Sequence, residues 1–188
     1  MVDLPWGDPR TVQFVTNVGL ITSNGPHGNN IMAAEWTHQI SYSPGLIAVC
    51  IGRGKTSLEN IKKTKEFGVN LASIDQNALA GIAGSSHGNE VNKIEALKEL
   101  GYKFFKAKTI NTLMVEDAAM QAECKVLKVI DIGDHPILIG EISYLYPAYN
   151  KEPLVYHKHA YWHLKETLKK PEEKEMVRIK STIMNHRK

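Results

Sequence analysis

The stretch from Asn29 to Asn70 constrains the fold and the function of this chain more than any other part of the sequence. It holds two strand-like runs, then a turn rich in glycine and basic residues, and then a helical run. The turn, Gly52–Ser57, directly follows the apolar run Leu46–Ile51. A turn that leads into a helix in this way brings main-chain N–H groups and cations together, which favours the binding of a phosphate. We therefore expect a phosphorylated ligand.

The helix after this turn has a recognisable start. Thr56 and Glu59 have the spacing of a capping box, which predicts a helix that runs through Ile61. The N–H groups of a first turn and the positive end of the helix dipole attract anions, and Lys55 adds a positive charge. The alternative is that Thr56 only caps the helix and that Arg53 and Lys55 are solvated. The turn by itself does not decide between the two.

The triplet Gly54-Lys55-Thr56 also ends like the phosphate-binding loop of nucleoside triphosphatases. That loop requires a glycine five residues before Gly54, and Val49 stands there instead. The alternation of strands and helices that would build the parallel sheet of such an enzyme does not follow either. The sequence therefore argues against a nucleoside triphosphatase.

The composition is that of an ordinary globular protein, because 43% of the 188 residues are hydrophobic and 23% are charged. We predict one domain over residues 1–163 and a charged tail over residues 164–188. The formal net charge is +3, and much of the excess lies in the tail, which argues against a nucleic-acid groove on the domain.

The chain carries no sign of secretion or of membrane insertion. Its first residues lack the pattern of a signal peptide, and the longest unbroken apolar run is about Leu46–Ile51. Cys50 and Cys124 lie in apolar strand-like runs, which is typical of buried, reduced thiols. We expect a cytoplasmic protein with no membrane partner and no nucleic-acid partner.

Short apolar runs separated by turn signals predict a mainly β fold. The predicted strands are Val12–Ser23, Ile31–Tyr42, Leu46–Ile51, Gly68–Ala72, Gln121–Ile132 and Pro136–Tyr146. The predicted helices are a helix from Ser57 and the runs Asp75–Ile82 and Glu90–Leu100, with a loop at Gly84–Asn89. Turns at Asn24–Pro26 and Gly133–His135 join neighbouring strands into hairpins. The sequence therefore predicts an antiparallel barrel with decorating helices.

The side chains give little indication of catalysis by the protein alone. His157, His159 and His163 form the closest group of histidines, but no single strand or helix presents all three on one face. No carboxylate or thiolate stands nearby at ligand spacing, so we expect no metal site. The sequence shows no nucleophile elbow and no acidic pair at a recognisable spacing. A bound cofactor is therefore expected to supply the chemistry.

Three blocks of sequence resemble a known family. The blocks are NNIMAAEWTHQISYSPGLIAVCI, GKTSLENI with FGVNLAS, and CKVLKVIDIGDHPILIGEI. Together they resemble the flavin reductase-like family of FMN-binding split barrels, which includes flavoredoxins, over roughly Phe14–Tyr161. The resemblance implies an antiparallel Greek-key split barrel. It also implies a homodimer with one FMN per subunit near the interface and, in many members, NADH or NADPH as the electron donor.

The resemblance also assigns roles to residues. It implies that Ala33–Thr37 lines the flavin ring, that Gly52–Ser57 holds the phosphate, and that His135 lies near flavin and nicotinamide as the catalytic residue. The expected cofactor-binding residues are Ala33, Ala34, Glu35, Trp36, Thr37, Cys50, Gly52, Lys55, Thr56, Ser57, Ser86, His87 and Lys93. The alternative role for Trp36 is ordinary barrel packing, and the alternative for His135 is an exposed turn residue.

One segment departs from the family pattern. Many flavoredoxin-like members carry a serine-glycine pair followed by an acidic residue and a lysine. Here the segment reads Ser86-His87-Gly88-Asn89-Glu90-Val91-Asn92-Lys93. Lys93 is kept, whereas His87 stands at the apparent serine position. The contacts of this loop with the FMN phosphate or with a partner subunit are therefore left open.

The expected function is that of an NAD(P)H-dependent flavin or ferric reductase, which passes electrons through FMN to a small molecule or a protein. The first alternative is a non-enzymatic FMN protein that takes electrons from a protein donor. The second alternative is an oligonucleotide-binding barrel. That alternative would need aromatic and basic residues interleaved along one face, and Phe104 and Phe105 are the only adjacent aromatic pair in a lysine-rich stretch.

Overall fold

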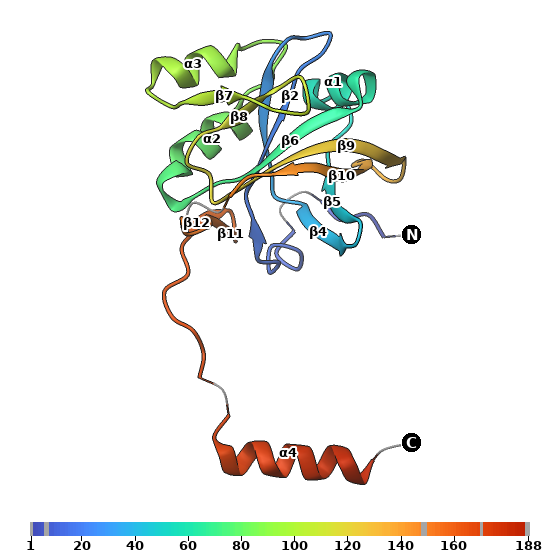
Figure 1. Cartoon of the computed structure of the whole chain (residues 1–188), viewed down its shortest axis with the longest axis vertical. Helices are drawn as coiled ribbons and strands as arrows, with labels where there is room; N and C mark the ends of the chain where they lie inside the picture. Colours follow the sequence, from blue (N-terminus) through green and yellow to red (C-terminus); the bar gives the residue numbers. More distant parts are fainter. Residues whose placement is uncertain (1, 6–7, 148–149, 170, 187–188) are drawn as a thin grey trace.

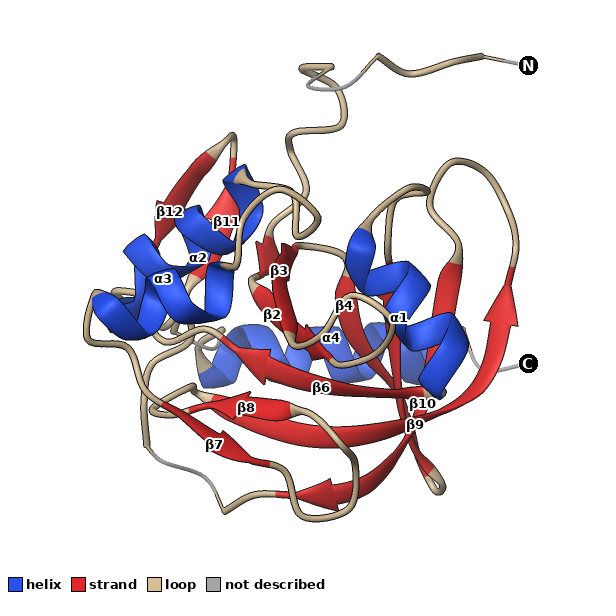
Figure 2. Ribbon diagram, turned by 90° about the horizontal axis from the view of Figure 1, so that it is seen from above, coloured by secondary structure: helices blue, strands red, loops and turns tan. Residues whose placement is uncertain are grey.

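The computed structural model describes residues 2–5, 8–147, 150–169 and 171–186. Its centre is a seven-stranded sheet in the order β3-β2-β6-β9-β10-β5-β4, and every neighbouring pair in it is antiparallel. The strands are β2 (Gly19–Ser23), β3 (Asn30–Ala34), β4 (Thr37–Tyr42), β5 (Gly45–Cys50), β6 (Glu66–Leu71), β9 (Met120–Ile130) and β10 (Ile137–Leu145). The sheet curls into a barrel-like form (Figure 2). The predicted antiparallel split barrel with few helices is confirmed.

Two small sheets complete the β structure. One contains β1 (Thr16–Asn17), β11 (Val155–His157) and β12 (Ala160–Trp162) in the order β1-β11-β12, and the other pairs β7 (Phe104–Lys106) with β8 (Leu113–Val115). The sequence did not predict β7, β8, β11 or β12 as strands. Each has only three residues, which is too short for the alternation of apolar and polar residues to stand out.

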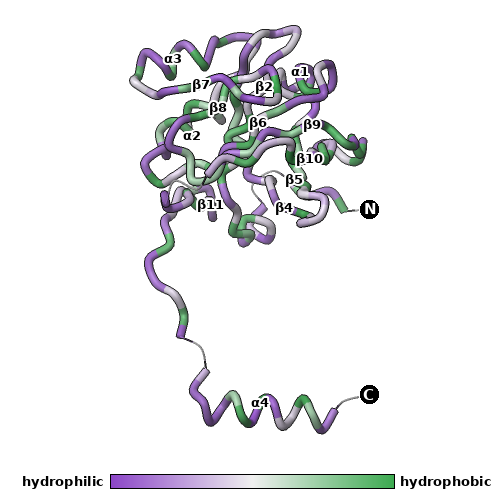
Figure 3. The backbone as a smooth tube through the Cα atoms, viewed as in Figure 1, coloured by the Kyte–Doolittle hydropathy of each residue, from purple (hydrophilic) through white to green (hydrophobic). Residues whose placement is uncertain are grey.

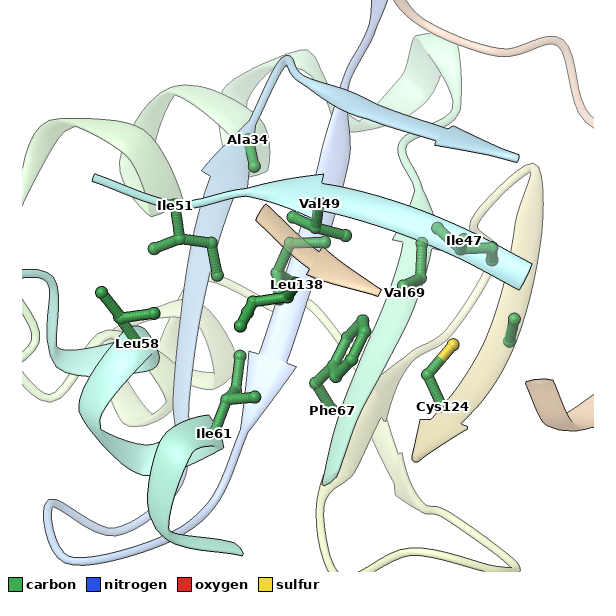
Figure 4. Close-up of a cluster of buried hydrophobic side chains, with 12 residues drawn as sticks. Ala34, Ile47, Val49, Ile51, Leu58, Ile61, Phe67, Val69, Cys124 and Leu138 are labelled. Atoms are coloured by element: carbon green, nitrogen blue, oxygen red, sulfur yellow. The ribbon is translucent and has the colours of Figure 1, made fainter. Parts of the chain in front are cut away.

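Helix α1 (Thr56–Thr64) lies against the barrel (Figure 1). Its Leu58 and Ile61 lie in one buried cluster with Phe67 of β6 and Leu138 of β10 (Figure 4). Burying a side chain of this size stabilises the fold by about 1.5–3 kcal/mol. These contacts therefore fix α1, and with it the N-terminal end of the helix, against the sheet.

A close approach inside the barrel depends on a glycine. Gly140 of β10 faces Phe67, and a Cβ at position 140 would collide with the phenyl ring and would lie 2.8 Å from the Cβ of Cys124. The register between β9 and β10 shifts next to this residue, between Ile139 and Gly140. The irregular pairing bends the hairpin at this close approach.

Two further helices cover the edge of the sheet at β3. A 3₁₀ turn (Ile74–Gln76) leads into α2 (Asn77–Ser85), and α3 (Lys93–Glu99) follows after a loop. Leu79 and Ala83 of α2 and Leu97 of α3 are buried in one cluster with Ile31 of β3. This packing places the loop between α2 and α3, residues 86–92, beside β3.

Two runs that were predicted as single strands are each divided in the structure. The run Val12–Ser23 begins with a turn, and its first strand, β1, pairs with β11 rather than with the main sheet. The run Ile31–Tyr42 breaks at Glu35 and Trp36, so that β3 and β4 lie at opposite edges of the sheet. The hydroxyl of Thr37 donates to the carbonyl of Ala34 at 3.0 Å, which stabilises the corner between the two strands.

The predicted helix boundaries also shift. The predicted helix Asp75–Ile82 begins as a 3₁₀ turn and ends at Ser85, inside the predicted loop. The predicted helix Glu90–Leu100 begins at Lys93 rather than at Glu90, because the side chain of Asn92 caps it by accepting from the N–H of Glu95. The predicted C-terminal end of this helix is confirmed, since Gly101 has a φ of +90°, a left-handed conformation that favours glycine.

The tail contains a helix, α4 (Glu173–Asn185), that lies away from the barrel (Figure 1). Pro171 precedes this helix and does not interrupt it. Hydrophobic and hydrophilic residues alternate along α4 (Figure 3), and Val177, Ile183 and Met184 are exposed. Within the described ranges, no helix is both long enough and apolar enough to span a bilayer. Cys50 and Cys124 are both free; Cys124 is buried, whereas Cys50 is only half-buried.

Candidate functional site

The N-terminal end of α1 is arranged differently from the predicted capping box. The helix begins at Thr56 itself, and Lys55 occupies the cap position without a side-chain hydrogen bond. Glu59 does not close a box but lies 2.6 Å from His27, in an ion-pair contact with the β2–β3 turn. The N–H groups of Leu58 and Glu59 donate to the carbonyl of Lys55. The prediction of Thr56 as the cap was therefore wrong, and Thr56 lies in the first turn.

A small cavity of about 50 Å³ lies at this end of the helix. It brings together segments that are far apart in the sequence, namely β3, the start of α1, the end of α2, the loop 86–92 and the start of α3. The lining residues are Asn30, Met32, Ala33, Lys55, Thr56, Ser57, Ala83, Gly84, Ser86, His87, Gly88 and Lys93. Seven of the predicted cofactor-binding positions therefore meet in one place: Ala33, Lys55, Thr56, Ser57, Ser86, His87 and Lys93.

Lys93 is the most unusual group in this cavity. Its side chain is only 3% exposed, and its Nζ donates to the carbonyls of Ala83 at 3.0 Å and Ser86 at 3.1 Å. An ammonium group has three N–H donors, so these two bonds leave one for a ligand. Burial and the nearby charge of Lys55 lower the pKa of Lys93 to about 8. A bound anion would oppose both effects and stabilise the charged form.

Two further contacts hold the cavity in shape. The side-chain amide of Asn30 donates to the hydroxyl of Ser57 at 2.9 Å, and both residues are buried. Gly88 packs against Asn30 so closely that a Cβ at position 88 would collide with its amide. The sequence did not identify Asn30 or Gly88 as site residues. The glycines of the loop were the available signal, because glycine often marks a close approach of the backbone.

The predicted ring-binding segment lies next to this cavity, at the corner between β3 and β4. Because β3 is at the edge of the sheet, no strand in the described part of the chain pairs with one side of it. Ala33 lines the cavity, whereas Ala34 is buried in the barrel core. Thr37 is 1% exposed and its hydroxyl bonds Ala34, so its side chain serves the corner and does not project from it.

Trp36 and His135 meet beside the corner. Their ring centroids are 4.8 Å apart and the ring planes meet at 61°, an edge-to-face arrangement. Trp36 is 46% exposed, so its indole is not an ordinary buried barrel side chain. His135 also lies over Gly52, where a Cβ would come within 3.2 Å of the imidazole Nε2. The histidine is therefore a packed group beside an exposed indole, and not a freely solvated turn residue.

Ionisable groups also surround Trp36 and His135. His135 Nδ1 lies 2.9 Å from the carboxylate of Asp134, and this contact lowers the pKa of Asp134. Burial raises the pKa of Glu35, although the nearby charges of His159 and His135 oppose the shift. The N–H of Cys50 donates to the carbonyl of Trp36 at 2.9 Å, which ties the end of β5 to the corner. Burial raises the pKa of the Cys50 thiol.

The histidines that prompted the question of a metal do not form a site. His157 lies in β11 and bonds the carbonyl of Phe14, whereas His159 and His163 lie outside any strand. Across the described part of the chain, no group of three or more His, Cys, Asp or Glu residues is placed to hold a metal ion.

Comparison with known proteins gives a consistent result. Residues 11–165 match the model of the flavin reductase like domain. An uncharacterized protein of Archaeoglobus fulgidus is 30% identical over 122 residues, which is 65% of this chain and 67% of that protein. The flavin reductase (NADH) of Kitasatospora aureofaciens is 27% identical over 156 residues, which is 80% of this chain and 78% of that protein.

Two solved structures share the fold. The FMN-binding protein of Thermus thermophilus has a TM-score of 0.77 and 21% identity, with 91% of this chain and 97% of that chain covered. The flavoredoxin of Methanosarcina acetivorans has a TM-score of 0.75 and 18% identity, with 87% of this chain and 92% of that chain covered. At these identities the likeness concerns the fold alone.

Proposed function

Because the chain belongs to the flavin reductase-like family, we propose that it is an oxidoreductase that binds FMN and accepts electrons from NADH or NADPH. The observation that carries the proposal is the cavity in which Lys55, Ser57 and Lys93 meet at the start of α1, beside Ala33. Relatives named flavin reductase (NADH) and FMN reductase (NADH) support the same reaction class.

The cavity suits the phosphate of FMN. Two lysines supply positive charge, and the start of α1 supplies the positive end of a helix dipole. Ser57 supplies a hydroxyl, and Lys93 holds an N–H beyond its two carbonyl bonds. Charge-assisted hydrogen bonds are about twice as strong as neutral ones. The proposed phosphate ligands are thus Lys55, Ser57 and Lys93, with His87 at the rim.

The corner between β3 and β4 suits the flavin ring. The edge of β3 at Ala33 offers main-chain groups, and the exposed Trp36 offers a flat apolar surface. When bound there, FMN supplies the redox chemistry, since its ring takes hydride from a nicotinamide and passes electrons on. His135 is held by Trp36, Gly52 and Asp134, so its proposed role is to orient the nicotinamide donor.

The electron donor distinguishes two forms of this function. A flavin or ferric reductase takes electrons from NADH or NADPH and delivers them to free flavin or to a metal complex, whereas the electron-transfer form takes them from a protein donor. We propose the reductase form, in a homodimer. The flavoredoxin fold of one structural neighbour gives the second form its support.

Rapid mixing under anaerobic conditions tests the proposal. The protein loaded with FMN is mixed with NADH or NADPH, and the visible flavin absorbance is followed. Bleaching by either nucleotide within a turnover time supports the reductase. If FMN binds and neither nucleotide bleaches it, the electron-transfer form is favoured. If no flavin binds, the proposal fails. Sedimentation of the same sample measures whether the protein is a dimer.

A further inference from the structure

The hairpin of β11 and β12 turns on two residues in an unfavourable conformation. His157 pairs with Ala160 across the hairpin, and Lys158 and His159 between them have φ values of +50° and +59°. A two-residue turn with positive φ at both positions usually contains asparagine, aspartate or glycine. Lys158 and His159 are both exposed, so burial does not account for these side chains. Strained backbone of this kind is concentrated at active sites and ligand contacts.

The hairpin is connected through β1 to the corner between β3 and β4. Gly19 pairs with Ala34 where β2 meets β3, so the chain that follows Ala34 meets the end of β1. The side-chain amide of Asn17 in β1 donates to the carbonyl of Thr37 at 2.7 Å, which ties the corner to β1. β1 in turn pairs with β11. The strained turn therefore belongs to the sheet that adjoins the proposed site of the flavin ring.

Glu35 is the acidic residue of this corner, and it is half-buried. Burial raises its pKa, whereas the nearby charges of His159 and His135 lower it, because a positive neighbour stabilises a carboxylate. Burial and the charge of Glu35 raise the pKa of Tyr156 on β11. His135 also has a carboxylate partner of its own, Asp134. The strained turn thus supplies a positive charge to a carboxylate at the proposed ring site.

A carboxylate at this position suits the donor of the proposed reaction. The dihydronicotinamide gives up a hydride, a hydrogen with two electrons, to the bound flavin and is left as a pyridinium cation. A negative group that is already in place stabilises the positive charge that develops in this step. We propose that Glu35 stabilises this charge, and that the strained turn holds His159 as a positioning residue for the Glu35 carboxylate. The imidazolium of His159 favours the ionised carboxylate in a half-buried place.

This inference rests on the proposed function, because it assigns Glu35 to the nicotinamide donor. It separates the roles of the two histidines, since His135 orients the donor and His159 acts through Glu35. It also gives a reason for the strain. Asparagine or glycine at position 159 would relax the turn but would remove the positive charge.

The test compares the parent chain with His159→Asn, Lys158→Asn and Glu35→Gln. Asparagine tolerates positive φ better than most residues, so both turn variants are expected to keep the hairpin. Lys158→Asn is the matched control, because it also removes a cation from the turn, and the histidine charges that act on Glu35 are those of His159 and His135. Melting curves without flavin should show neither turn variant to be less stable than the parent.

The first measurement uses the flavin-free protein. The side-chain carboxyl carbon of Glu35 is titrated by NMR, and its signal is identified by its absence from Glu35→Gln. His159→Asn should move the midpoint of this titration to a higher pH, because the carboxylate loses a positive neighbour. Lys158→Asn should leave the midpoint where it is in the parent.

The second measurement follows the bleaching of bound FMN by NADH or NADPH across a range of pH. The rate per bound flavin should fall in the parent as the pH decreases and Glu35 takes up a proton. In His159→Asn this fall should occur at a higher pH, by the same shift as in the titration, and Lys158→Asn should follow the parent. Glu35→Gln should be about tenfold slower at neutral pH, the effect of one charged contact.

Three outcomes would overturn the inference. One is a titration midpoint of Glu35 that is the same in His159→Asn as in the parent. Another is a Lys158→Asn control that shifts the midpoint as much as His159→Asn does. The third is Glu35→Gln that is bleached as fast as the parent at every pH. A protein that binds no flavin would refute the proposed function instead, while the flavin-free titration would still show whether His159 acts on Glu35.

Discussion

The indole of Trp36 and the imidazole of His135 meet edge to face with their centroids 4.8 Å apart, although they belong to distant parts of the chain. Trp36 stands at the corner that ends β3, and His135 stands in the turn between β9 and β10. The barrel brings His135 over Gly52 as well, at the start of the loop that leads to α1. The proposed ring site and the proposed phosphate site are therefore joined by one short segment.

The first prediction concerns His135. Replacing it by alanine should slow the reduction of bound FMN by NADH or NADPH while leaving FMN content largely intact, because the imidazole contacts the corner and not the phosphate cavity. Rate and occupancy are measured on the same sample. His186→Ala, in the tail, is the control and should change neither. Loss of FMN at an unchanged rate per bound flavin would reassign His135 to cofactor binding.

The second prediction concerns Lys55. The variant Lys55→Ala should weaken FMN by about tenfold to a hundredfold, because a hydrogen bond to a charged group contributes about 1.5–3 kcal/mol. Riboflavin, which has no phosphate, should bind the variant as it binds the parent chain. Lys62→Ala, in the last turn of α1, is the control. Equal losses for FMN and riboflavin would show that the phosphate does not lie at Lys55.

The third prediction concerns Lys93 and pH. Its pKa of about 8 lies below the ordinary value for lysine, so the folded protein loses this proton at a lower pH than the unfolded chain. In that window the unfolded chain binds more protons, so stability without flavin should rise as pH increases above 8, by at most about 3 kcal/mol. FMN binding should weaken over the same range, because the phosphate loses a positive partner.

The variant Lys93→Met isolates this contribution, since it retains a long side chain without the charge. It should flatten both pH profiles relative to the parent chain. Chemical unfolding at a series of pH values measures the stability, and FMN and riboflavin titrations measure the binding. An FMN profile with the same slope in Lys93→Met would assign the pH dependence to another group.

The fourth prediction concerns the barrel core. Gly140→Ala should destabilise the fold by about 1–3 kcal/mol, because the added Cβ collides with Phe67 in a packed interior. Gly81→Ala is the matched control: a Cβ there meets nothing within 4 Å, and alanine favours a helix over glycine by about 0.5–1 kcal/mol. Denaturant unfolding should show opposite signs for the two variants. A neutral Gly140→Ala would mean that Phe67 moves aside.

The sequence predicted elements whose signal is local. The β9–β10 hairpin alternates over many residues around a glycine turn, and its prediction is confirmed. The break between β3 and β4 was missed, because it depends on Thr37 bonding Ala34 in a sheet that curls, and the apolar pattern continues through it. The capping box at Thr56 failed for a similar reason, since Glu59 pairs with His27 from another turn.

In the candidate site, too, the residues with a local sequence signal were predicted and those that depend on tertiary contacts were missed. Lys55 and Ser57 were predicted from their place in a turn before a helix, and both line the cavity. Asn30 was missed, because its contact with Ser57 depends on the register of β3 against α1. The roles of Trp36, His135 and the loop residues came from resemblance, and their catalytic and binding roles stay predictions.

The order of strands in the main sheet has a consequence for synthesis of the chain on the ribosome. β5 and β6 are near neighbours in sequence, yet the β9–β10 hairpin lies between them in the sheet. A nascent chain that has not yet released β10 therefore holds two fragments of sheet whose facing edges are unpaired. The two fragments can join into the seven-stranded sheet only when the β9–β10 hairpin is available. Until then, unpaired edges of this kind favour pairing with other chains and aggregation.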